Sequence, residues 1–394
     1  MNTNLFEKEK EYFIHTYKRI PVDISYGEGV YLYDKQGNRY LDLFSGLGVN
    51  ALGYAHPGIV KAVSDQISKY AHLSNYFVTD IQVEFSEKLL KCSRMSKVFL
   101  SNSGTEAVEA AIKLIRKKYG PDKRIFSLTN AFHGRTYGAL SLTANTKYRA
   151  PFLPLLPNIY QLEFNSLDDL KKNLGPDTAA VFVEFIQGEG GINLVSEEFI
   201  KELKILKEKY NFILVSDCVQ SGIGRTGKAF AHDYYDISPD IILAAKAIGG
   251  GLPLGAMLVN DTLAEEFAPG DHGTTFGGNS VCCAAGNVVL TEVFEHGLVD
   301  EVKKNGAYFI DQLIVLRDMY PGHIKEVRGR GYMIGIDFKY ECTNIVEKLR
   351  NRRIFANCTN NTVLRLLPPL ILEKNDIDFF LYNLHEIIKE TDKI

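Results

Sequence analysis

The chain has 394 residues, of which 45% are hydrophobic and 24% charged, the composition of a globular protein long enough for more than one domain. Its 45 basic and 48 acidic residues leave a formal net charge of −3, which gives no electrostatic basis for binding nucleic acid or an anionic membrane. No apolar stretch approaches the roughly 18 residues of a membrane helix, and the N-terminus has neither an apolar signal core nor an Arg-rich transit sequence.

The pattern along the chain predicts three parts. Residues 1–50 begin with a short helix and continue with a hairpin, whose strands flank a turn at 35–38. Residues 51–295 alternate apolar strands with amphipathic helices. The strands are 97–100, 124–128, 179–184, 212–217 and 241–245, and the helices include 105–119 and 197–210. Residues 296–394 change to a helix, strands at 331–338 and 363–367, and a final helix at 376–391.

Strands that are apolar on both faces and alternate with helices predict a mostly parallel sheet covered by helices on both faces. We therefore expect an α/β fold with a large domain at 51–295 and a smaller C-terminal α+β domain at 296–394, completed by the segment 1–50. In open α/β sheets, ligands bind at the carboxyl ends of the strands. Glu184, Asp217 and Lys246 all lie at such strand ends.

Lys246 is the most informative residue, because it follows an apolar run and precedes the glycines at 249–251. A lysine at the end of a buried strand can lose its proton and become a nucleophile toward a carbonyl. Asp217 ends a second apolar run in the same way. Pyridoxal phosphate (PLP) requires such a pair, the lysine for its carbonyl and the aspartate for its ring nitrogen. Read alone, Lys246 could equally be a solvated lysine at a strand-to-loop junction.

The segment 101–106, with Ser103, Gly104 and Thr105, follows a strand and opens a helix. Its hydroxyls, close backbone approach and free first-turn amides would suit a phosphate, although an ordinary N-cap has the same pattern. Phe132 could stack on a pyridine ring and Arg135 could clamp a carboxylate. A solvated loop would explain that segment too, with His133 as a structural residue. Glycine-rich segments at 187–191 and 272–279 could each be a turn, but their occurrence in this order beside the lysine and aspartate is improbable by chance.

Together these segments resemble the class III PLP-dependent aminotransferases of fold type I. The matching segments are 50–57, 74–77, 101–106, 132–136, 187–191, 217–227, 246–255, 273–279 and 364–369. The resemblance is greatest to the branch that acts on N-acetylornithine, and it implies transfer of the δ-amino group between N-acetylornithine and 2-oxoglutarate in arginine biosynthesis. Branches acting on ornithine, succinylornithine, 4-aminobutyrate or an acyl-lysine are alternatives, as is an inactive PLP-binding regulatory relative.

The resemblance also implies a role for each motif residue. The cofactor would be held by Ser103, Gly104, Thr105, Phe132, His133, Asp217, Gln220, Lys246 and Thr275. Lys246 would be the Schiff-base lysine and the acid/base of the proton shift, and Asp217 would pair with the ring nitrogen. Thr275 would reach the phosphate of the partner subunit in a homodimer. Arg135 would bind the α-carboxylate of the acylated substrate, Arg365 would bind 2-oxoglutarate, and Glu189 would pair with Arg365 while the amino donor is bound.

Two positions depart from the family pattern. Cys218 stands where the family has Glu after the cofactor aspartate, and Phe185 stands where it has Pro. We expect Phe185 to leave its turn looser and Cys218 to be sensitive to oxidation. The six cysteines are sparse and lack metal-ligand spacing, so we expect mostly reduced thiols, no bound metal and a cytoplasmic protein.

Overall fold

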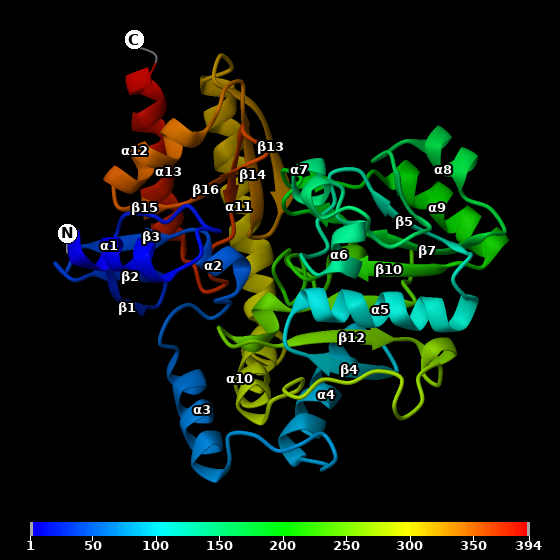
Figure 1. Cartoon of the computed structure of the whole chain (residues 1–394). Helices are drawn as coiled ribbons and strands as arrows, with labels where there is room; N and C mark the ends of the chain where they lie inside the picture. Colours follow the sequence, from blue (N-terminus) through cyan, green and yellow to red (C-terminus); the bar gives the residue numbers. More distant parts are fainter. Residues whose placement is uncertain (1–2, 392–394) are drawn as a thin grey trace.

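A seven-stranded sheet forms the centre of the larger part of the molecule in the computed structural model, which describes residues 3–391 (Figure 1). In spatial order its strands are β4 (Lys97–Ser101), β12 (Gly255–Val259), β11 (Ile241–Ala244), β10 (Ile213–Asp217), β7 (Thr178–Val183), β5 (Arg124–Leu128) and β6 (Ile159–Leu162). Only β12 runs antiparallel to its two neighbours, so the mostly parallel sheet is confirmed. Strand β12 itself was not predicted, because its apolar run follows the glycine loop without a break.

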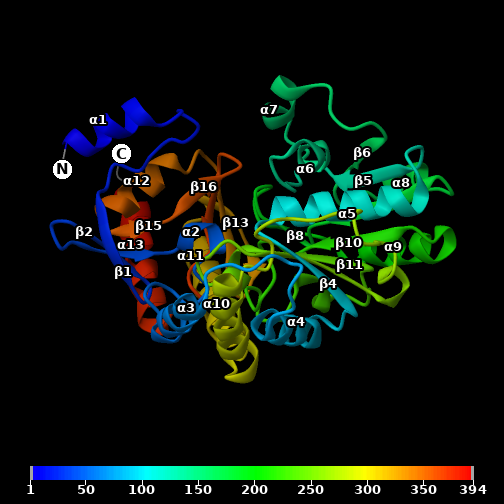
Figure 2. The same ribbon diagram turned by 60° about the horizontal axis from the view of Figure 1, so that its bottom comes forward.

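Helices cover both faces of this sheet (Figures 1 and 2). The helices of this part of the chain are α3 (Pro57–Lys69), α4 (Asp80–Ser93), α5 (Gly104–Tyr119), α6 (Tyr137–Leu142), α7 (Thr146–Arg149), α8 (Leu167–Asn173), α9 (Glu197–Tyr210) and α10 (Ser280–Leu290), of which α3 packs against α10 and α7 against α6. Successive residues of β7 point to opposite faces. Ala180 and Phe182 join a core with α5, whereas Val181 and Val183 join a core with α9. The strand is buried on both faces, which explains its continuous apolar sequence.

Capping residues in the sequence set the limits of the main helices. Ser103 caps α5, since its Oγ accepts a hydrogen bond from the backbone N–H of Glu106 at 3.4 Å. Gly120 ends the same helix with a φ of 81°. Ser196 caps α9 in the same manner, and Asn211 ends it in the left-handed conformation. The first turn of α5 is therefore fixed next to the carboxyl ends of the strands.

The smaller part of the molecule combines both ends of the chain. It contains α1 (Thr3–Tyr12), α2 (Ser45–Gly48), α11 (Leu298–Met319), α12 (Thr343–Asn351) and α13 (Lys374–Thr391). One sheet has the order β1 (Ile24–Glu28), β2 (Tyr31–Asp34), β3 (Arg39–Asp42) and β15 (Ile354–Phe355). The other has the order β13 (Ile324–Arg330), β14 (Met333–Phe338), β17 (Val363–Leu366) and β16 (Asn357–Thr359). In both views the N-terminal strands lie beside the C-terminal elements.

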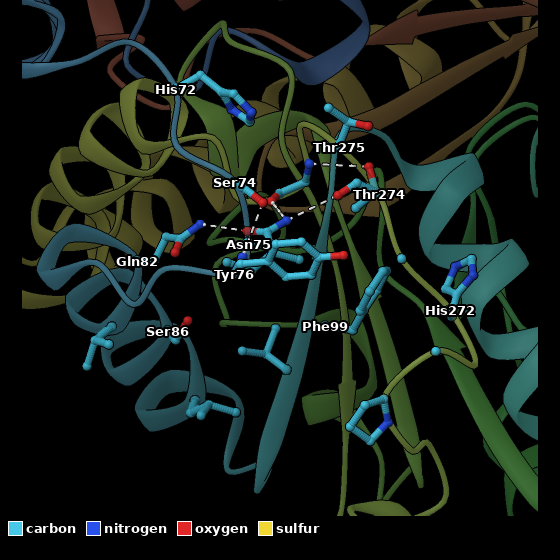
Figure 3. Close-up of a pocket in the computed structure, with 18 of the residues that line it drawn as sticks. His72, Ser74, Asn75, Tyr76, Gln82, Ser86, Phe99, His272, Thr274 and Thr275 are labelled. Carbon is cyan, nitrogen blue, oxygen red and sulfur yellow. Dashed lines mark hydrogen bonds between the residues drawn. The ribbon is translucent and has the colours of Figure 1, made fainter.

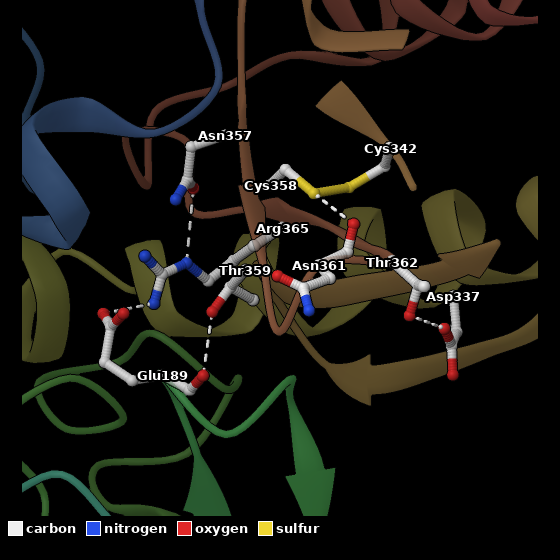
Figure 4. The surroundings of a disulfide bond; sticks show 9 residues. All are labelled: Glu189, Asp337, Cys342, Asn357, Cys358, Thr359, Asn361, Thr362 and Arg365. Atoms are coloured by element: carbon white, nitrogen blue, oxygen red, sulfur yellow. Dashed lines mark hydrogen bonds and ion pairs between the residues drawn. A yellow bond between two sulfur atoms is a disulfide. The ribbon is translucent and has the colours of Figure 1, made fainter. Parts of the chain in front are cut away.

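The cysteines differ from the expectation at one pair. Cys342 and Cys358 form a disulfide (Figure 4), whereas the other four cysteines are free. The expectation of reduced thiols is wrong for this pair, because the fold brings their Cα atoms to 5.9 Å, within the range for a disulfide. Within residues 3–391, no helix is long and apolar enough to cross a membrane. The same residues contain no cluster of three or more His, Cys, Asp or Glu side chains that could hold a metal ion.

Candidate active site

Three neighbouring strands deliver side chains to one cavity of about 630 Å³. Glu184 follows β7, Asp217 ends β10, and Lys246 follows β11. All three line this cavity, at the carboxyl ends of their strands. Eleven of the residues singled out in the sequence line it: Ser103, Gly104, Thr105, Phe132, His133, Arg135, Glu184, Glu189, Asp217, Gln220 and Lys246. Arg365 lies behind Glu189, and Thr275 lines a different cavity.

Lys246 has an unusual backbone and an unpaired amine. Its φ is 49°, in the left-handed region that a residue with a long side chain rarely adopts. Such outliers persist where the surrounding structure enforces them, often at functional sites. No hydrogen bond or ion pair to Nζ occurs within residues 3–391, and burial lowers the pKa of Lys246 despite the opposing charges of Glu189 and Asp217. The amine can therefore lose its proton more readily than a solvated lysine and act on a carbonyl.

Asp217 is held by a buried histidine. Its Oδ2 lies 2.7 Å from His133 Nδ1, and its Oδ1 accepts a hydrogen bond from the backbone N–H of Val219 at 3.0 Å. Burial alone would lower the pKa of His133, but the hydrogen bond and charge of Asp217 outweigh burial and raise it. His133 therefore keeps a proton for Asp217, which orients the carboxylate beside the cavity. The family resemblance implies that His133 binds the cofactor, and in the structure its ring contacts Asp217.

Glu184 joins two segments of the cavity wall. Its Oε2 accepts a hydrogen bond from the backbone N–H of Phe132 at 2.9 Å, and its Oε1 accepts one from Gly188 at 3.2 Å. Burial raises the pKa of Glu184 to about 7, the Asp217 charge adds to the shift, and His133 opposes it. One carboxyl group thus fixes both the backbone under the Phe132 ring and the loop that carries Glu189.

Arg135 presents a guanidinium group that forms no hydrogen bond or ion pair with any other residue of 3–391. Its central carbon lies 3.7 Å from the ring centroid of Tyr148 and 5.5 Å from that of Phe132. The two rings meet edge to face, with centroids 6.1 Å apart. Stacking on Tyr148 restrains the guanidinium plane while its N–H groups stay free. Arg135 is therefore suited to bidentate binding of a carboxylate that enters the cavity.

Arg365 and Glu189 form an ion pair at the cavity wall (Figure 4). Arg365 Nη1 lies 2.6 Å from Glu189 Oε1, and only 1% of the Arg365 side chain is exposed. Burial alone would raise the pKa of Glu189, but the Arg365 charge outweighs it and holds that pKa below its usual value. Glu189 lines the cavity and Arg365 does not. The carboxylate therefore covers the guanidinium and would have to move before Arg365 could bind a ligand.

The first turn of α5 leaves room for a group close to its backbone. A Cβ on Gly104 would lie 2.8 Å from the Val219 methyl groups, and one on Gly134 would lie 2.3 Å from Thr105 Oγ1. These glycines keep the cavity open beside the amides of the helix N-terminus, which favour an anion. A phosphate at this turn, a ring between Phe132 and the opposite wall, and a carbonyl near Lys246 Nζ match the parts of PLP, so the residues present fit this cofactor.

Sequence reasoning missed two aromatic residues of the site. Tyr17, from the segment before β1, lines the cavity although 73% of its surface is exposed. Tyr148 supports Arg135 from α7. Both come from short connecting segments without a helical or strand period, so periodicity gave no signal. Tyr148 lies 13 positions after Arg135, and Tyr137 lies nearer, so local spacing gave no signal for Tyr148.

The two departures from the family pattern are both buried. Phe185 is fully buried and packs against His232 and Tyr235, so its side chain anchors this turn in the core. Cys218 is 1% exposed, and burial raises the pKa of its thiol to about 12. Its Sγ lies 3.2 Å from Ser216 Oγ. A buried thiol with a raised pKa is inert, which contradicts the expected sensitivity of Cys218 to oxidation.

The whole chain is similar to known proteins. Residues 12–388 match the sequence profile of the family described as Aminotransferase class-III. The acetylornithine aminotransferase of Aquifex aeolicus (strain VF5) is 43% identical over 383 residues, 96% of this chain and 100% of that protein. The acetylornithine aminotransferase of Clostridium acetobutylicum is 43% identical over 386 residues, again 96% of this chain and 100% of the relative.

Solved structures agree in fold with this chain. The ornithine aminotransferase from Toxoplasma gondii ME49 superposes with a TM-score of 0.94 at 29% identity, covering 99% of this chain and 95% of that chain. The acetylornithine aminotransferase from Elizabethkingia anophelis superposes with a TM-score of 0.88 at 32% identity, covering 98% of each chain.

Proposed function

This chain belongs to the class III aminotransferases, and on that premise we propose that it moves the δ-amino group between N-acetylornithine and 2-oxoglutarate. The products in the forward direction are N-acetylglutamate semialdehyde and glutamate. The enzyme is a PLP-dependent transaminase of fold type I. The observation that carries the choice of substrates is the pair of arginines, one unpaired in the cavity wall and one covered by Glu189.

Different residues of the cavity would hold different parts of the cofactor. Ser103, Gly104 and Thr105 would hold the phosphate, Phe132 the ring face, Asp217 the ring nitrogen, and Gln220 the ring hydroxyl. When bound, PLP supplies a carbonyl that takes up the amino group and a ring that stabilises negative charge on the substrate carbon. Lys246 Nζ, with its lowered pKa, can accept a proton from that carbon and return it. His133 holds the Asp217 carboxylate in its orientation throughout.

The two arginines account for two different substrates in one cavity. N-acetylornithine carries its carboxylate at the far end from the reacting δ-amine, where the free guanidinium of Arg135 can bind it. Its reacting carbon has no carboxylate, so Glu189 can stay on Arg365 and satisfy the buried charge. Glutamate and 2-oxoglutarate carry a carboxylate next to the reacting carbon. That carboxylate would replace Glu189 on Arg365.

Substituting Arg135 tests this assignment. We expect Arg135→Ala to lower kcat/KM for N-acetylornithine about 10- to 100-fold, since a hydrogen-bonded charge contributes ~1.5–3 kcal/mol. Arg94→Ala serves as a control, because Arg94 is exposed and pairs with Asp233 away from the cavity. Unchanged kcat/KM in Arg135→Ala would remove the arginine from the substrate site. Ornithine remains the second candidate, because an ornithine aminotransferase superposes with a TM-score of 0.94, and rates with both amines decide between them.

We also propose a homodimer in which Thr275 completes the partner's phosphate site. Thr275 lines a second cavity of about 1170 Å³ beside Asn75 and Tyr76 (Figure 3). Asn75 Nδ2 donates hydrogen bonds to the carbonyls of Thr274 and Gly277, both at 3.1 Å, which shapes this segment. Nearby Tyr76, Phe77 and Val78 are all exposed, and a run of exposed apolar side chains of this kind is suited to a second copy.

Mixed dimers test the role of Thr275. One chain carries Lys246→Ala and the other carries Thr275→Ala. If Thr275 serves the partner subunit, the site with an intact lysine also receives an intact threonine, and about half of the wild-type activity is expected. If Thr275 serves its own subunit, no intact site exists, and the activity falls to about half that of the Thr275→Ala homodimer, because only one of the two subunits still has Lys246.

Three broader assignments remain proposals. The resemblance to acetylornithine aminotransferases supports a place in arginine biosynthesis. The composition supports a cytoplasmic location. The division into residues 1–50, 51–295 and 296–394 is supported by the parallel pairing of β3 with β15, which joins the first segment to the last.

A further inference from the structure

A short strand holds both members of the Arg365–Glu189 pair. On β16, Asn357 lies directly opposite Arg365 of β17, and its Oδ1 accepts a hydrogen bond from Arg365 Nε at 3.3 Å. Two residues further, Thr359 Oγ1 donates a hydrogen bond to the backbone carbonyl of Glu189 at 2.8 Å. Figure 4 shows these two contacts. One strand therefore contacts the side chain of the arginine and the backbone of the glutamate that covers it.

The residue between these two faces the other way. Because side chains alternate along a strand, Cys358 points away from the face that carries Asn357 and Thr359. It forms the disulfide with Cys342, which is fully buried at the start of α12. The disulfide thus joins the strand to α12 on one face, while the other face holds the ion pair.

The covalent bond matters because β16 has few other constraints. It is three residues long, lies at the edge of its sheet and, within residues 3–391, pairs only with β17. A short edge strand has few backbone hydrogen bonds to fix its position. A hydrogen bond from the backbone N–H of Cys342 to the carbonyl of Asn361, at 3.0 Å, would remain without the disulfide. Breaking the bond would therefore loosen the strand without detaching it.

We propose that Asn357 and Thr359 are positioning residues for the Arg365–Glu189 pair, and that the Cys342–Cys358 disulfide controls how firmly they hold it. The proposal rests on the proposed function in one respect, that Arg365 binds the carboxylate next to the reacting carbon of a dicarboxylic substrate. The oxidised protein binds such a dicarboxylate more tightly than the reduced protein, because Asn357 then keeps the Arg365 guanidinium in place after Glu189 has moved away. Binding of the acylated amine, which uses Arg135, does not depend on the disulfide.

The switch needs only a dithiol reductant. Cys358 is partly exposed, so one sulfur of the bond is accessible to it. One thiol of the reductant attacks the Cys358 sulfur, which breaks the bond to Cys342 and forms a mixed disulfide with Cys358. The second thiol of the reductant then attacks its own sulfur in the mixed disulfide and releases Cys358. Two electrons and two hydrogens pass to Cys342 and Cys358, which become thiols. The reductant leaves as a cyclic disulfide.

The first measurement is the number of free thiols in the denatured protein. The structure predicts four free thiols in the oxidised protein and all six cysteines as thiols after treatment with dithiothreitol. Six thiols in every preparation, including protein exposed to an oxidised dithiol, would overturn the proposal. This count is independent of enzymatic activity.

The second measurement is the affinity of PLP-loaded protein for glutarate, determined by calorimetry after removal of the reductant. Glutarate is a dicarboxylate that neither donates nor accepts an amino group. Reduced protein and the Cys342→Ser/Cys358→Ser variant are expected to bind glutarate about three- to tenfold more weakly than oxidised protein. Asn357→Ala is expected to show the same loss, and Cys282→Ser, which removes a free thiol, is expected to show none. The KM for N-acetylornithine should stay unchanged in all of them.

Equal glutarate affinity in oxidised and reduced protein would overturn the proposal, as would a parallel rise in the KM for N-acetylornithine. The outcome separates this proposal from the proposed function. A protein that shows the redox-dependent glutarate affinity but does not turn over N-acetylornithine would refute the assigned donor and leave the positioning role intact.

Discussion

Removing the charge of Glu189 tests how one cavity serves two substrates. Glu189 Oε1 lies 2.6 Å from Arg365 Nη1, and Arg365 is almost fully buried. With charge centres about 4 Å apart and an effective dielectric constant of about 20, the attraction is at most ~4 kcal/mol. At about 1.4 kcal/mol per factor of ten, this attraction can change the ratio of kcat/KM for the two substrates by at most about three orders of magnitude. Burial of Glu189 opposes the attraction, so we expect a shift of about 10- to 100-fold.

The assay follows each half-reaction separately through the absorbance of the bound cofactor. In Glu189→Ala, Arg365 is uncovered, so glutamate should bind more tightly. The preference of the enzyme for N-acetylornithine over glutamate should therefore decrease. The ratio of kcat/KM for N-acetylornithine to that for glutamate is expected to fall about 10- to 100-fold. Glu189→Gln keeps the shape of the side chain, and its ratio of kcat/KM values should fall in the same direction. Glu208→Ala, an exposed carboxylate on α9, is the matched control. An unchanged ratio in Glu189→Ala would refute the covering role.

Three further predictions concern Tyr148, Glu184 and Cys218. Tyr148→Leu should raise the KM for N-acetylornithine about two- to fivefold, because a cation–π contact at an exposed site contributes ~0.5–1 kcal/mol. Tyr148→Phe keeps an aromatic ring and should keep the wild-type KM. Equal KM values in all three proteins would show that the ring does not position Arg135. Since burial raises the pKa of Glu184 from 4.5 to about 7, the folded protein holds this proton more tightly than the unfolded chain, and stability is lost as pH rises through that range. Urea unfolding of wild type and Glu184→Gln should therefore show the wild type losing stability relative to the variant between pH 5 and 8, and a constant difference would contradict the assignment. Mild peroxide should inactivate wild type and Cys218→Ser at the same rate, since the thiol is buried; protection by the substitution would show that it is accessible.

The strand ends were predictable because they follow from simple patterns. The apolar runs before Asp217 and Lys246 are continuous, as expected for strands buried on both faces, and a parallel sheet places their ends at one edge. The first turn of α5 was predictable from the capping serine and the glycine that follows it. These patterns are local, so each could be read without knowledge of the tertiary structure.

The contacts between distant segments were not predictable in this way. Tyr148 supports Arg135 from a four-residue helix that has no periodicity of its own. Asn357 reaches Arg365 because β16 pairs with β17 in one register, and the sequence of a three-residue strand cannot specify that register. Cys342 and Cys358 are separated by 16 positions without a motif, so only the folded chain brings their sulfur atoms together.

The proposed amino donor can be identified from the cofactor spectrum of the purified protein during titration with amines. N-acetylornithine, ornithine and 4-aminobutyrate are added in turn to the PLP-loaded enzyme. We expect the absorbance band of the bound aldehyde form to give way to that of the aminated form at the lowest concentration with N-acetylornithine. Preferential conversion by another amine would contradict the proposed substrate. A bound cofactor whose spectrum responds to no amine donor would contradict the aminotransferase activity itself.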